Sequence, residues 1–314
     1  MLTDEKILIT GPAGLIAFGL AESLVANNEV WGIARFGDPE SRAAVDALGV
    51  TTRAVDLGSG DFGDLPRDFT YLVHVAVAYE KTSYDRAIRV NAEGTGLILE
   101  HCRKAKAALV MSTTSVYKPH PDPWYAFGEE DALGDIQAQF SAPYSVSKIA
   151  QEAVARYCAR SLALPVTIAR MNAAYGDRGG AITNHMDLVA AGAAVPTRHD
   201  PMPYSAIHDD DIKAQLEPLL HAAAVPATIV NWGADEPVSV QEWTAYMGQL
   251  MGIETLVDVT PVPWASVGSV VDCRKRIAIT GPSTVKWKDG LRRVMEHRYP
   301  DRIVDGHGER IVGG

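Results

Sequence analysis

The sequence predicts an α/β fold, namely a doubly wound parallel sheet with a smaller, discontinuous C-terminal lobe. Over the first two-thirds of the 314 residues, short β-branched runs alternate with longer amphipathic stretches, a pattern typical of parallel strands joined by helices. A glycine-rich turn at residues 11–17 follows the first apolar run directly. After Gly176 the pattern is broken by paired glycines and several prolines, and this break marks the start of the lobe.

Seven segments have the length and the aliphatic content of strands in a parallel sheet. They are residues 6–10, 30–34, 51–55, 71–75, 107–112, 166–170 and 228–231, with helices between them. Right-handed crossovers would place those helices on both faces of the sheet and leave a crevice at the carboxyl ends of the strands. We predict a larger domain at residues 1–176, to which residues 204–236 return, and a lobe made of residues 177–203 and 237–314.

Composition and charge exclude several classes of protein. A chain with 47% hydrophobic residues can bury a substantial core, and a net charge of −10 argues against a surface for nucleic acid or anionic membranes. Cys102, Cys158 and Cys273 lack Cys-x-x-Cys spacing, so we expect reduced thiols and no metal site. The acidic first residues run straight into a strand, without room for a signal peptide, and no apolar stretch could span a bilayer. We expect a cytoplasmic protein that acts on a small molecule.

The glycine turn has features of a dinucleotide site. Gly11 would permit the sharp turn, and Gly14 would let backbone N–H groups approach a diphosphate at the start of the next helix. The expected contacts are Gly11, Ala13, Gly14, Leu15 and Ile16. The spacing Gly-x-x-Gly-x-x-Ala differs from the commoner Gly-x-Gly-x-x-Gly, and an ordinary turn is the alternative. Residues 279–282 repeat its opening letters without the second glycine, and we predict a loop there.

Tyr144 and Lys148 are four residues apart on a predicted helix, so the phenol and the ammonium would share one helix face. Tyrosine ordinarily keeps its proton until about pH 10, but a nearby cation lowers its pKa. We therefore expect Lys148, helped by the cationic ring of a bound cofactor, to lower the pKa of Tyr144 toward neutrality, where the phenol could exchange a proton with a substrate. A solvated helix face is the alternative interpretation of the pair.

Further segments follow in a characteristic order. They are Asp56 and Leu57 after the third strand, residues 74–77 after the fourth, Asn91 on a long helix, and residues 110–117, 170–176 and 208–211. With the glycine turn and the Tyr144–Lys148 pair, this series resembles the extended short-chain dehydrogenase/reductase family, in its group of NAD-dependent epimerases and dehydratases. The resemblance covers most of the chain and implies a Rossmann domain that binds NAD(P) and a lobe that binds the substrate.

The resemblance also implies roles for single residues. Counting back from Val116 and Tyr117 assigns the catalytic hydroxyl to Thr113, with Thr114 as the close competitor, and Tyr144 and Lys148 complete the catalytic set. Besides the glycine turn, the implied cofactor contacts are Asp56, Leu57, Val75, Ala76, Val77, Asn91, Tyr144 and Lys148. The helices around residues 89–104 and 144–163 would pair with their copies in a homodimer.

The end of the second strand bears on the choice of cofactor. NAD enzymes usually have an acidic residue there that bonds the ribose 2′-hydroxyl, whereas this chain has Ala34 and Arg35. A guanidinium at this point suits the 2′-phosphate of NADP. We therefore predict NADP, with NAD as the alternative in which Arg35 is an ordinary surface residue.

The predicted function is that of an NAD(P)H-dependent oxidoreductase that reduces a small carbonyl compound or oxidises the corresponding alcohol. Two alternatives stay open: a nucleotide-sugar epimerase with tightly bound NAD, and a non-catalytic NADP-sensing protein. Substrate contacts are expected at Thr114, Trp124, Tyr125, Met171 and Asn172.

Departures from the family pattern disfavour a nucleotide sugar. Epimerases of the family typically have an arginine for the diphosphate where this chain has Tyr204, and an asparagine where it has Ala173. No second arginine for the phosphates lies near Pro263 and Ala265. The Asp-Glu pair of the 4,6-dehydratases is also replaced, by Thr114 and Ser115.

His208 and the three aspartates that follow it are suggestive of a metal cluster. Adjacent side chains seldom converge on one ion, however, and aspartates suit the positive end of a helix dipole. We therefore predict that this run caps the helix that follows.

Overall fold

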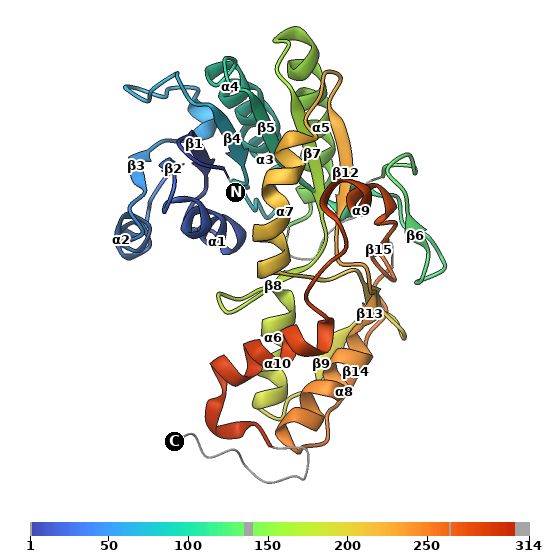
Figure 1. The fold of residues 1–314 in the computed structure, drawn as a ribbon. Coiled ribbons are helices and arrows are strands. Elements are labelled where there is room, and N and C mark those ends of the chain that lie inside the picture. The colour runs from blue at the N-terminus through green and yellow to red at the C-terminus, as the bar shows by residue number, and fades with distance from the viewer. Residues whose placement is uncertain (1, 135–140, 264, 305–314) are drawn as a thin grey trace.

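The computed structural model describes residues 2–134, 141–263 and 265–304, and a seven-stranded parallel sheet lies at its centre (Figure 1). In chain order the strands of this sheet are β1 (Lys6–Thr10), β2 (Glu29–Ala34), β3 (Thr51–Ala54), β4 (Tyr71–His74), β5 (Ala107–Thr113), β7 (Val166–Met171) and β12 (Thr228–Trp232). Every predicted strand is present with ends that differ by one residue at most. The predicted fold class is confirmed.

The strand order β12-β7-β5-β4-β1-β2-β3 places the first strand in the interior of the sheet. From β1 the chain moves outward through β2 and β3, and then crosses back to add β4 on the other side of β1. The order therefore reverses between β1 and β4. In open α/β sheets such a reversal leaves a crevice at the carboxyl ends of the strands, where ligands bind.

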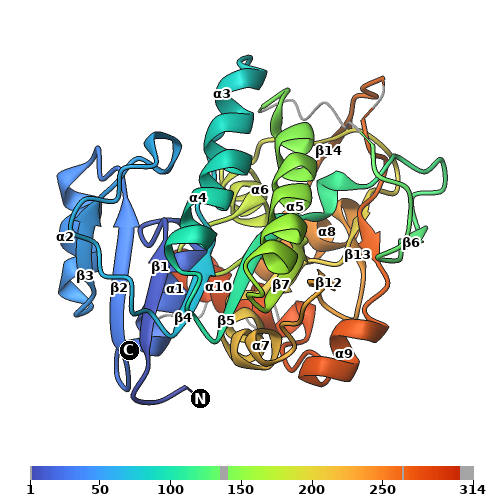
Figure 2. The ribbon, with the colours of Figure 1, turned by 90° about the horizontal axis from the view of Figure 1, so that it is seen from above.

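Helices cover both faces of the sheet (Figure 2). The α-helices are α1 (Leu15–Leu24), α2 (Pro39–Ala47), α3 (Tyr84–Ile88), α4 (Gly94–His101), α5 (Tyr144–Ser161), α6 (Ala181–Ala190), α7 (Asp209–His221), α8 (Val240–Met251), α9 (Arg274–Thr280) and α10 (Trp287–Arg298). A π-helical segment, η2 (Arg89–Glu93), joins α3 to α4, and the short 3-10 turns are η1 (Leu57–Ser59), η3 (Thr114–Val116) and η4 (Pro300–Arg302).

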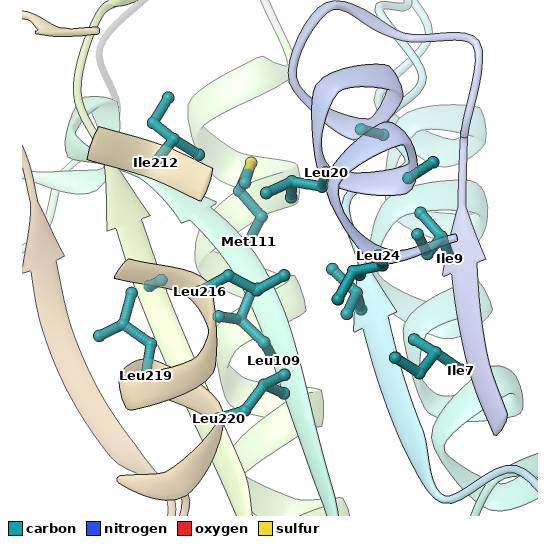
Figure 3. Close-up of a cluster of buried hydrophobic side chains, with 14 of the residues drawn as sticks. Ile7, Ile9, Leu20, Leu24, Leu109, Met111, Ile212, Leu216, Leu219 and Leu220 are labelled. Atoms are coloured by element: carbon teal, nitrogen blue, oxygen red, sulfur yellow. The ribbon is translucent and has the colours of Figure 1, made fainter. Parts of the chain in front are cut away.

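Two hydrophobic layers hold the helices to the sheet, because successive side chains of a strand point to opposite faces. Ile7 and Ile9 of β1 pack in the layer that α1 and α7 supply, with Leu20 and Leu216 (Figure 3). Leu8 points the other way, into the layer beneath α4 and α5. Full burial of such an aliphatic side chain stabilises the fold by roughly 1.5–3 kcal/mol.

A third hydrophobic cluster forms the centre of the smaller lobe, where α6, α8 and α10 contribute Met186, Trp243 and Val294. Short strand pairs complete this part and its junction with the sheet: β8 (Ala174–Tyr175) with β11 (Ile207–His208), β9 (Val195–Thr197) with β14 (Val257–Val259), β10 (Pro203–Tyr204) with β13 (Val238–Ser239), and β6 (Ala126–Phe127) with β15 (Val270–Val271). Between two passages through the lobe the chain returns to the larger layer as α7 and β12. The domain limits themselves stay a prediction.

One local prediction was wrong. Residues 279–282 do not form a loop throughout, because α9 continues to Thr280. Gly281 then ends the helix with a φ of 77°, a conformation that glycine adopts without strain.

Candidate active site

A cavity of about 990 Å³ lies at the carboxyl ends of the central strands. Its wall combines residues of the glycine turn, of the loops after β2, β3 and β4, of the end of β5, and of the start of α5 and α6. The predicted site residues that line it are Gly11, Ala13, Gly14, Leu15, Ile16, Arg35, Asp56, Leu57, Val75, Ala76, Val77, Thr113, Tyr144, Lys148, Met171 and Asn172. The fold therefore brings together residues that are far apart in the sequence.

The glycine turn has the shape that a diphosphate requires. Gly11 has a φ of 67°, and a Cβ added to it would lie 3.1 Å from the Cα of Ala76. Gly14 is the N-cap of α1, and no side chain caps that helix end. The backbone N–H groups at the start of α1 can therefore donate hydrogen bonds to a negatively charged group, because no capping side chain takes them up. These features fit a dinucleotide.

A buried polar network supports the wall opposite the turn. Thr10 Oγ1 accepts hydrogen bonds from the backbone N–H groups of Val75 (3.0 Å) and Ala76 (2.9 Å), so its own hydrogen is directed to His74 Nδ1 at 2.8 Å. The other ring nitrogen, Nε2, lies 2.7 Å from Thr95 Oγ1. His74 is therefore neutral with its proton on Nε2. Burial lowers its pKa to about 3.

The three predicted catalytic residues come from two elements. Thr113 is the last residue of β5, and its Oγ1 accepts the backbone N–H of Ser115 at 3.2 Å. Tyr144 is the first residue of α5, and Lys148 lies one turn further. The Lys148 ammonium is buried and donates to the backbone oxygen of Met111 at 2.7 Å. Burial lowers the pKa of Lys148 to about 7, while the Glu152 carboxylate acts in the opposite direction.

In the protein alone, the pKa of Tyr144 is shifted in the direction opposite to the one expected with a cofactor. Burial raises the pKa of its phenol well above the ordinary value, the hydroxyl of Tyr79 raises it further, and a hydrogen bond with Thr113 lowers it. Desolvation disfavours a phenolate, and it is the largest of these effects. Tyr144 therefore keeps its proton here, and it is not a phenol already close to ionisation.

Beneath Lys148 lies a buried ion pair. The Arg170 guanidinium binds both carboxylate oxygens of Glu152, at 2.9 and 2.7 Å, and Ser112 Oγ donates to the same carboxylate at 2.6 Å. Arg170 also donates to the hydroxyl of Tyr117 at 3.0 Å. A two-point pair of this kind has a defined geometry, so it ties β5, β7 and α5 together directly behind the cavity.

At the opposite end of the cavity, Arg35 is exposed and follows β2. Ser41 of α2 and the cations Arg86 and Arg89 also line the cavity. The carboxylate of Asp38, which comes shortly after Arg35, caps α2 by accepting the backbone N–H groups of residues 40 and 41. The region around Arg35 thus offers positive charge to a ligand, and the role of Arg35 in cofactor binding stays a prediction.

Four predicted site residues do not line the cavity. Asn91 is buried behind it, and its side chain bonds the backbone N–H and C=O of Ala78. Trp124 is 42% exposed, and Tyr125 stacks on His120 with ring centroids 4.0 Å apart. The fourth, Thr114, lies deeper, where its Oγ1 is 2.9 Å from Ser269 Oγ.

Ser269 also contacts Asn172, whose amide donates to the backbone oxygen of Ser269 at 2.7 Å. This pairing brings a loop near residue 269 to the edge of the reacting region. In the same loop, a Cβ on Gly268 would lie 2.1 Å from the backbone oxygen of Pro123. The loop is therefore packed directly on the segment that contains Trp124.

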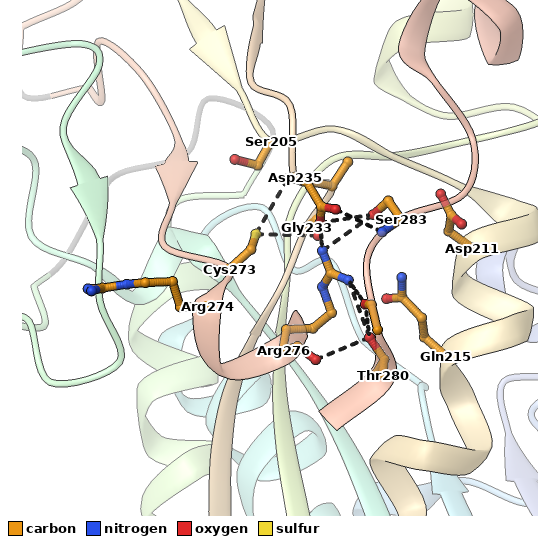
Figure 4. A network of polar contacts seen from close by, with 12 residues as sticks. Ser205, Asp211, Gln215, Gly233, Asp235, Cys273, Arg274, Arg276, Thr280 and Ser283 are labelled. Carbon is orange, nitrogen blue, oxygen red and sulfur yellow. Dashed lines mark hydrogen bonds and ion pairs between the residues drawn. The ribbon is translucent and has the colours of Figure 1, made fainter. Parts of the chain in front are cut away.

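The arginines near this loop are engaged elsewhere. Arg276 is fully buried, where it pairs with Asp235 and bonds Thr280 and Ser283 (Figure 4). Arg274 points outward and pairs with Asp272. Neither lines the cavity.

His208 is the N-cap of α7, where its Nδ1 accepts the backbone N–H of Asp210 at 3.1 Å. The three aspartates occupy the first turn of the helix. The predicted cap is confirmed.

Sequence reasoning missed Tyr79 and Ser269. Tyr79 lines the cavity beside Tyr144, and its place shortly after β4, at the reversal of strand order, was a usable signal. Ser269 lies far along the chain in the lobe, and only the tertiary fold brings it to Thr114 and Asn172.

The sheet order and the glycine turn define an α/β protein of the Rossmann type. The chain belongs to the NAD dependent epimerase/dehydratase family, whose sequence profile matches residues 7–197. The resemblance to the extended short-chain dehydrogenases is thereby confirmed, and the chain is a member of an enzyme family.

Curated relatives include a trifunctional UDP-glucose 4,6-dehydratase/UDP-4-keto-6-deoxy-D-glucose 3,5-epimerase/UDP-4-keto-L-rhamnose-reductase of Arabidopsis thaliana, 24% identical over 93% of this chain and 47% of the relative. The chain thus spans about half the length of such relatives. Among solved structures, UDP-glucuronic acid 4-epimerase from Bacillus cereus matches with a TM-score of 0.80 and 21% identity, over 94% of this chain and 100% of the other. A dTDP-glucose 4,6-dehydratase from Streptomyces venezuelae matches with a TM-score of 0.80 and 21% identity, over 95% and 98%. These likenesses concern the fold.

Within the residues that the structure describes, none of the helices combines the length and the apolar character that crossing a bilayer demands.

Proposed function

We propose that this protein is an NAD(P)-dependent enzyme that oxidises a hydroxyl group of a nucleotide sugar, or reduces the corresponding carbonyl. The observation that carries the chemistry is the position of Thr113, Tyr144 and Lys148 along one cavity with the glycine turn. The substrate class follows the relatives, which are named for reactions of UDP- and dTDP-sugars. This reverses our preference for a small carbonyl compound.

The proposed roles of the residues follow from their chemistry. When bound, the nicotinamide ring would accept or supply a hydride at the substrate carbon. Tyr144, whose pKa is raised, would donate its proton to a carbonyl oxygen, and the Thr113 hydroxyl would hydrogen-bond the same oxygen. Lys148, with a pKa of about 7, would change its charge near neutral pH and thereby modulate Tyr144.

Among reactions of nucleotide sugars, we favour epimerisation, in which one carbon is oxidised and re-reduced without net redox change. Loss of water would need an acid and a base beside the catalytic hydroxyl. Thr114 and Ser115 occupy those positions, and neither is a strong acid or base.

For the cofactor we propose NADP, on the basis of Arg35 and the lack of a carboxylate at Ala34. NAD is the alternative, and the solved epimerase and dehydratase named above contain it. Arg35→Ala should weaken NADPH relative to NADH by about tenfold or more, the effect of one charge-assisted hydrogen bond. Ala34→Asp should extend the change, because a carboxylate repels the 2′-phosphate.

Fluorescence titration with each reduced cofactor measures this preference. Arg103→Ala, an exposed arginine outside the cavity, serves as the control and should leave both affinities unchanged. A wild-type protein that prefers NADH, or equal weakening of both cofactors in Arg35→Ala, contradicts the assignment of NADP.

One observation favours a second candidate, an oxidoreductase for a small carbonyl compound. Ser269 bonds both Thr114 and Asn172 at the edge of the reacting region. Tyr204 stands where epimerases of the family typically have an arginine for the diphosphate, and Ala173 stands where they have an asparagine. Both features reduce the space and the positive charge available to a nucleotide diphosphate.

A single screen separates the candidates. The purified protein is incubated with UDP- and dTDP-sugars, whose conversion is followed by chromatography, and with small carbonyl compounds, whose reduction is followed by the absorbance of NADPH and NADH. Conversion of nucleotide sugars alone supports the first proposal, and reduction of small carbonyls alone supports the second. Cofactor binding without any turnover would support the sensing protein.

A further inference from the structure

Tyr79 brings a second phenol to the site. It follows β4 and lines the cavity, and its ring centroid lies 5.4 Å from that of Tyr144 with an interplanar angle of 31°. The two phenols share a hydrogen bond. Although it is close to the proposed proton donor, Tyr79 is 58% exposed, so one side of its ring faces the open part of the cavity.

The position of Tyr79 is held by the backbone on both sides of it. Before it, the Asn91 amide accepts from the N–H of Ala78 at 2.7 Å and donates to its C=O at 3.0 Å. The same amide donates to Ser147 Oγ of α5 at 3.0 Å. After it, Ser141 Oγ donates to the backbone oxygen of Glu80 at 2.5 Å. Asn91, predicted as a cofactor contact, thus connects the Tyr79 loop to the helix that carries Tyr144.

We propose that Tyr79 is a positioning residue for Tyr144: its hydroxyl holds the Tyr144 hydroxyl before substrate binds and releases it when a substrate oxygen takes its place. The proposal rests on the proposed function of Tyr144 as proton donor and deepens it. A hydrogen bond to a neighbouring phenol keeps the donor oriented without the charge of a carboxylate. Both residues line the cavity, so a ligand that enters it can compete for this bond.

The groups around Tyr144 determine how its pKa should respond when the Tyr79 hydroxyl is removed. Thr113 faces it from β5, Lys148 from its own helix, and Tyr79 from the loop after β4. Of the further charged groups of the cavity wall, Arg86 pairs with Glu80 at 2.8 Å, and Arg89 and Arg35 lie along the same wall. Since Tyr79 raises the pKa of Tyr144, removing only the Tyr79 hydroxyl should lower that pKa.

The test uses Tyr79→Phe, which keeps the ring and removes the hydroxyl. The full chain is labelled at tyrosine Cζ for NMR, and the Tyr144 signal is assigned by its absence in Tyr144→Phe. In Tyr79→Phe that signal should move at neutral pH, because a hydrogen bond is lost, and should begin to titrate at lower pH than in the wild type. Tyr84→Phe, a partly exposed tyrosine of α3 outside the cavity wall, is the matched control and should leave the signal in place.

An unchanged Tyr144 signal in Tyr79→Phe, with a melting curve like that of the wild type, overturns the proposal. The measurement needs no substrate, so it separates the two ideas. A signal that moves in a protein that turns over nothing refutes the proposed function and retains only the hydrogen bond between Tyr79 and Tyr144. An active protein in which the Tyr144 signal does not move supports the proposed function and refutes the role of Tyr79.

Discussion

Tyr144 holds a proton that its surroundings keep in place. Its ring is partly buried, Tyr79 and Thr113 engage its hydroxyl, and burial raises its pKa. A group in this state can give a proton to a carbonyl oxygen as negative charge develops there. The proposed chemistry therefore depends on one hydroxyl, and that hydroxyl can be removed without changing the ring.

Tyr144→Phe should reduce turnover by about a hundredfold or more while leaving cofactor affinity nearly intact, because only proton transfer is lost. Steady-state kinetics on whichever substrate the screen identifies, together with fluorescence titration of the cofactor, would measure both quantities. A variant that keeps more than about a tenth of the wild-type rate removes Tyr144 from the mechanism.

Which side chains gather around the site could be predicted only in part. Motif spacing was sufficient for Thr113, Tyr144 and Lys148, because each lies at the end of a strand or the start of a helix whose place the sheet determines. The sign of the Tyr144 pKa could not be predicted, since local spacing does not show how deeply a group is desolvated. Ser269 could not be predicted either, because its contact with Thr114 spans 155 positions of the chain.

At the level of elements, the neutral imidazole of His74 joins two strands and the helical layer. It bonds Thr10 of β1 and Thr95 of α4, and Gln151 of α5 donates to the same Thr95 hydroxyl at 2.9 Å. Its folded pKa of about 3 lies well below the ordinary value of about 6.5. Between these values the unfolded chain binds more protons than the folded one, so the free energy of unfolding falls as the pH falls.

We predict that this histidine contributes about 2 kcal/mol of the loss in unfolding free energy between neutral pH and about pH 5. Urea unfolding of the wild type and of His74→Gln at several pH values would measure the contribution, as the difference between the two slopes with pH. His221→Gln, at an exposed position of α7, should keep the wild-type slope. Equal slopes in the wild type and His74→Gln would show that the imidazole is not held neutral by the fold.

The elements themselves were predicted well for a physical reason. The strands of the central sheet are buried on both faces, so each is an almost continuous apolar run that is bounded clearly in the sequence. Residues 279–280 were assigned wrongly because the end of a short helix at a glycine has a local sequence like that of a turn. The π-helical segment η2 has no such signature, since its wider turn is a response to packing.

For the whole molecule, the resemblance predicts a homodimer through α4 and α5. The structure distinguishes core residues of these helices from residues that could form an interface. Ile98 is fully buried in the core, while Leu97 is 39% and Tyr157 70% exposed. Ala153 is also exposed, and Val154 packs partly against the core. An apolar face thus remains on these two helices after the core is formed.

We predict a dimer in light scattering at micromolar concentration and a shift to monomer in Tyr157→Glu, because a charge would be buried in the interface. Leu256→Glu, which changes a residue 66% exposed beyond these helices, should leave the dimer intact. A monomer at that concentration in the wild type rules out this assembly.

The chain returns to the sheet late in the sequence, and this limits where the protein can be truncated. The segment that matches the family profile ends at residue 197, yet β12 pairs with β7 from Thr228 to Trp232, and α7 fills the layer beside α1. A fragment cut at the limit of the profile would carry an unpaired, apolar sheet edge and an uncovered face, which are the features that drive chains to aggregate. The segment that the family profile matches is therefore shorter than the unit that we expect to fold as one piece.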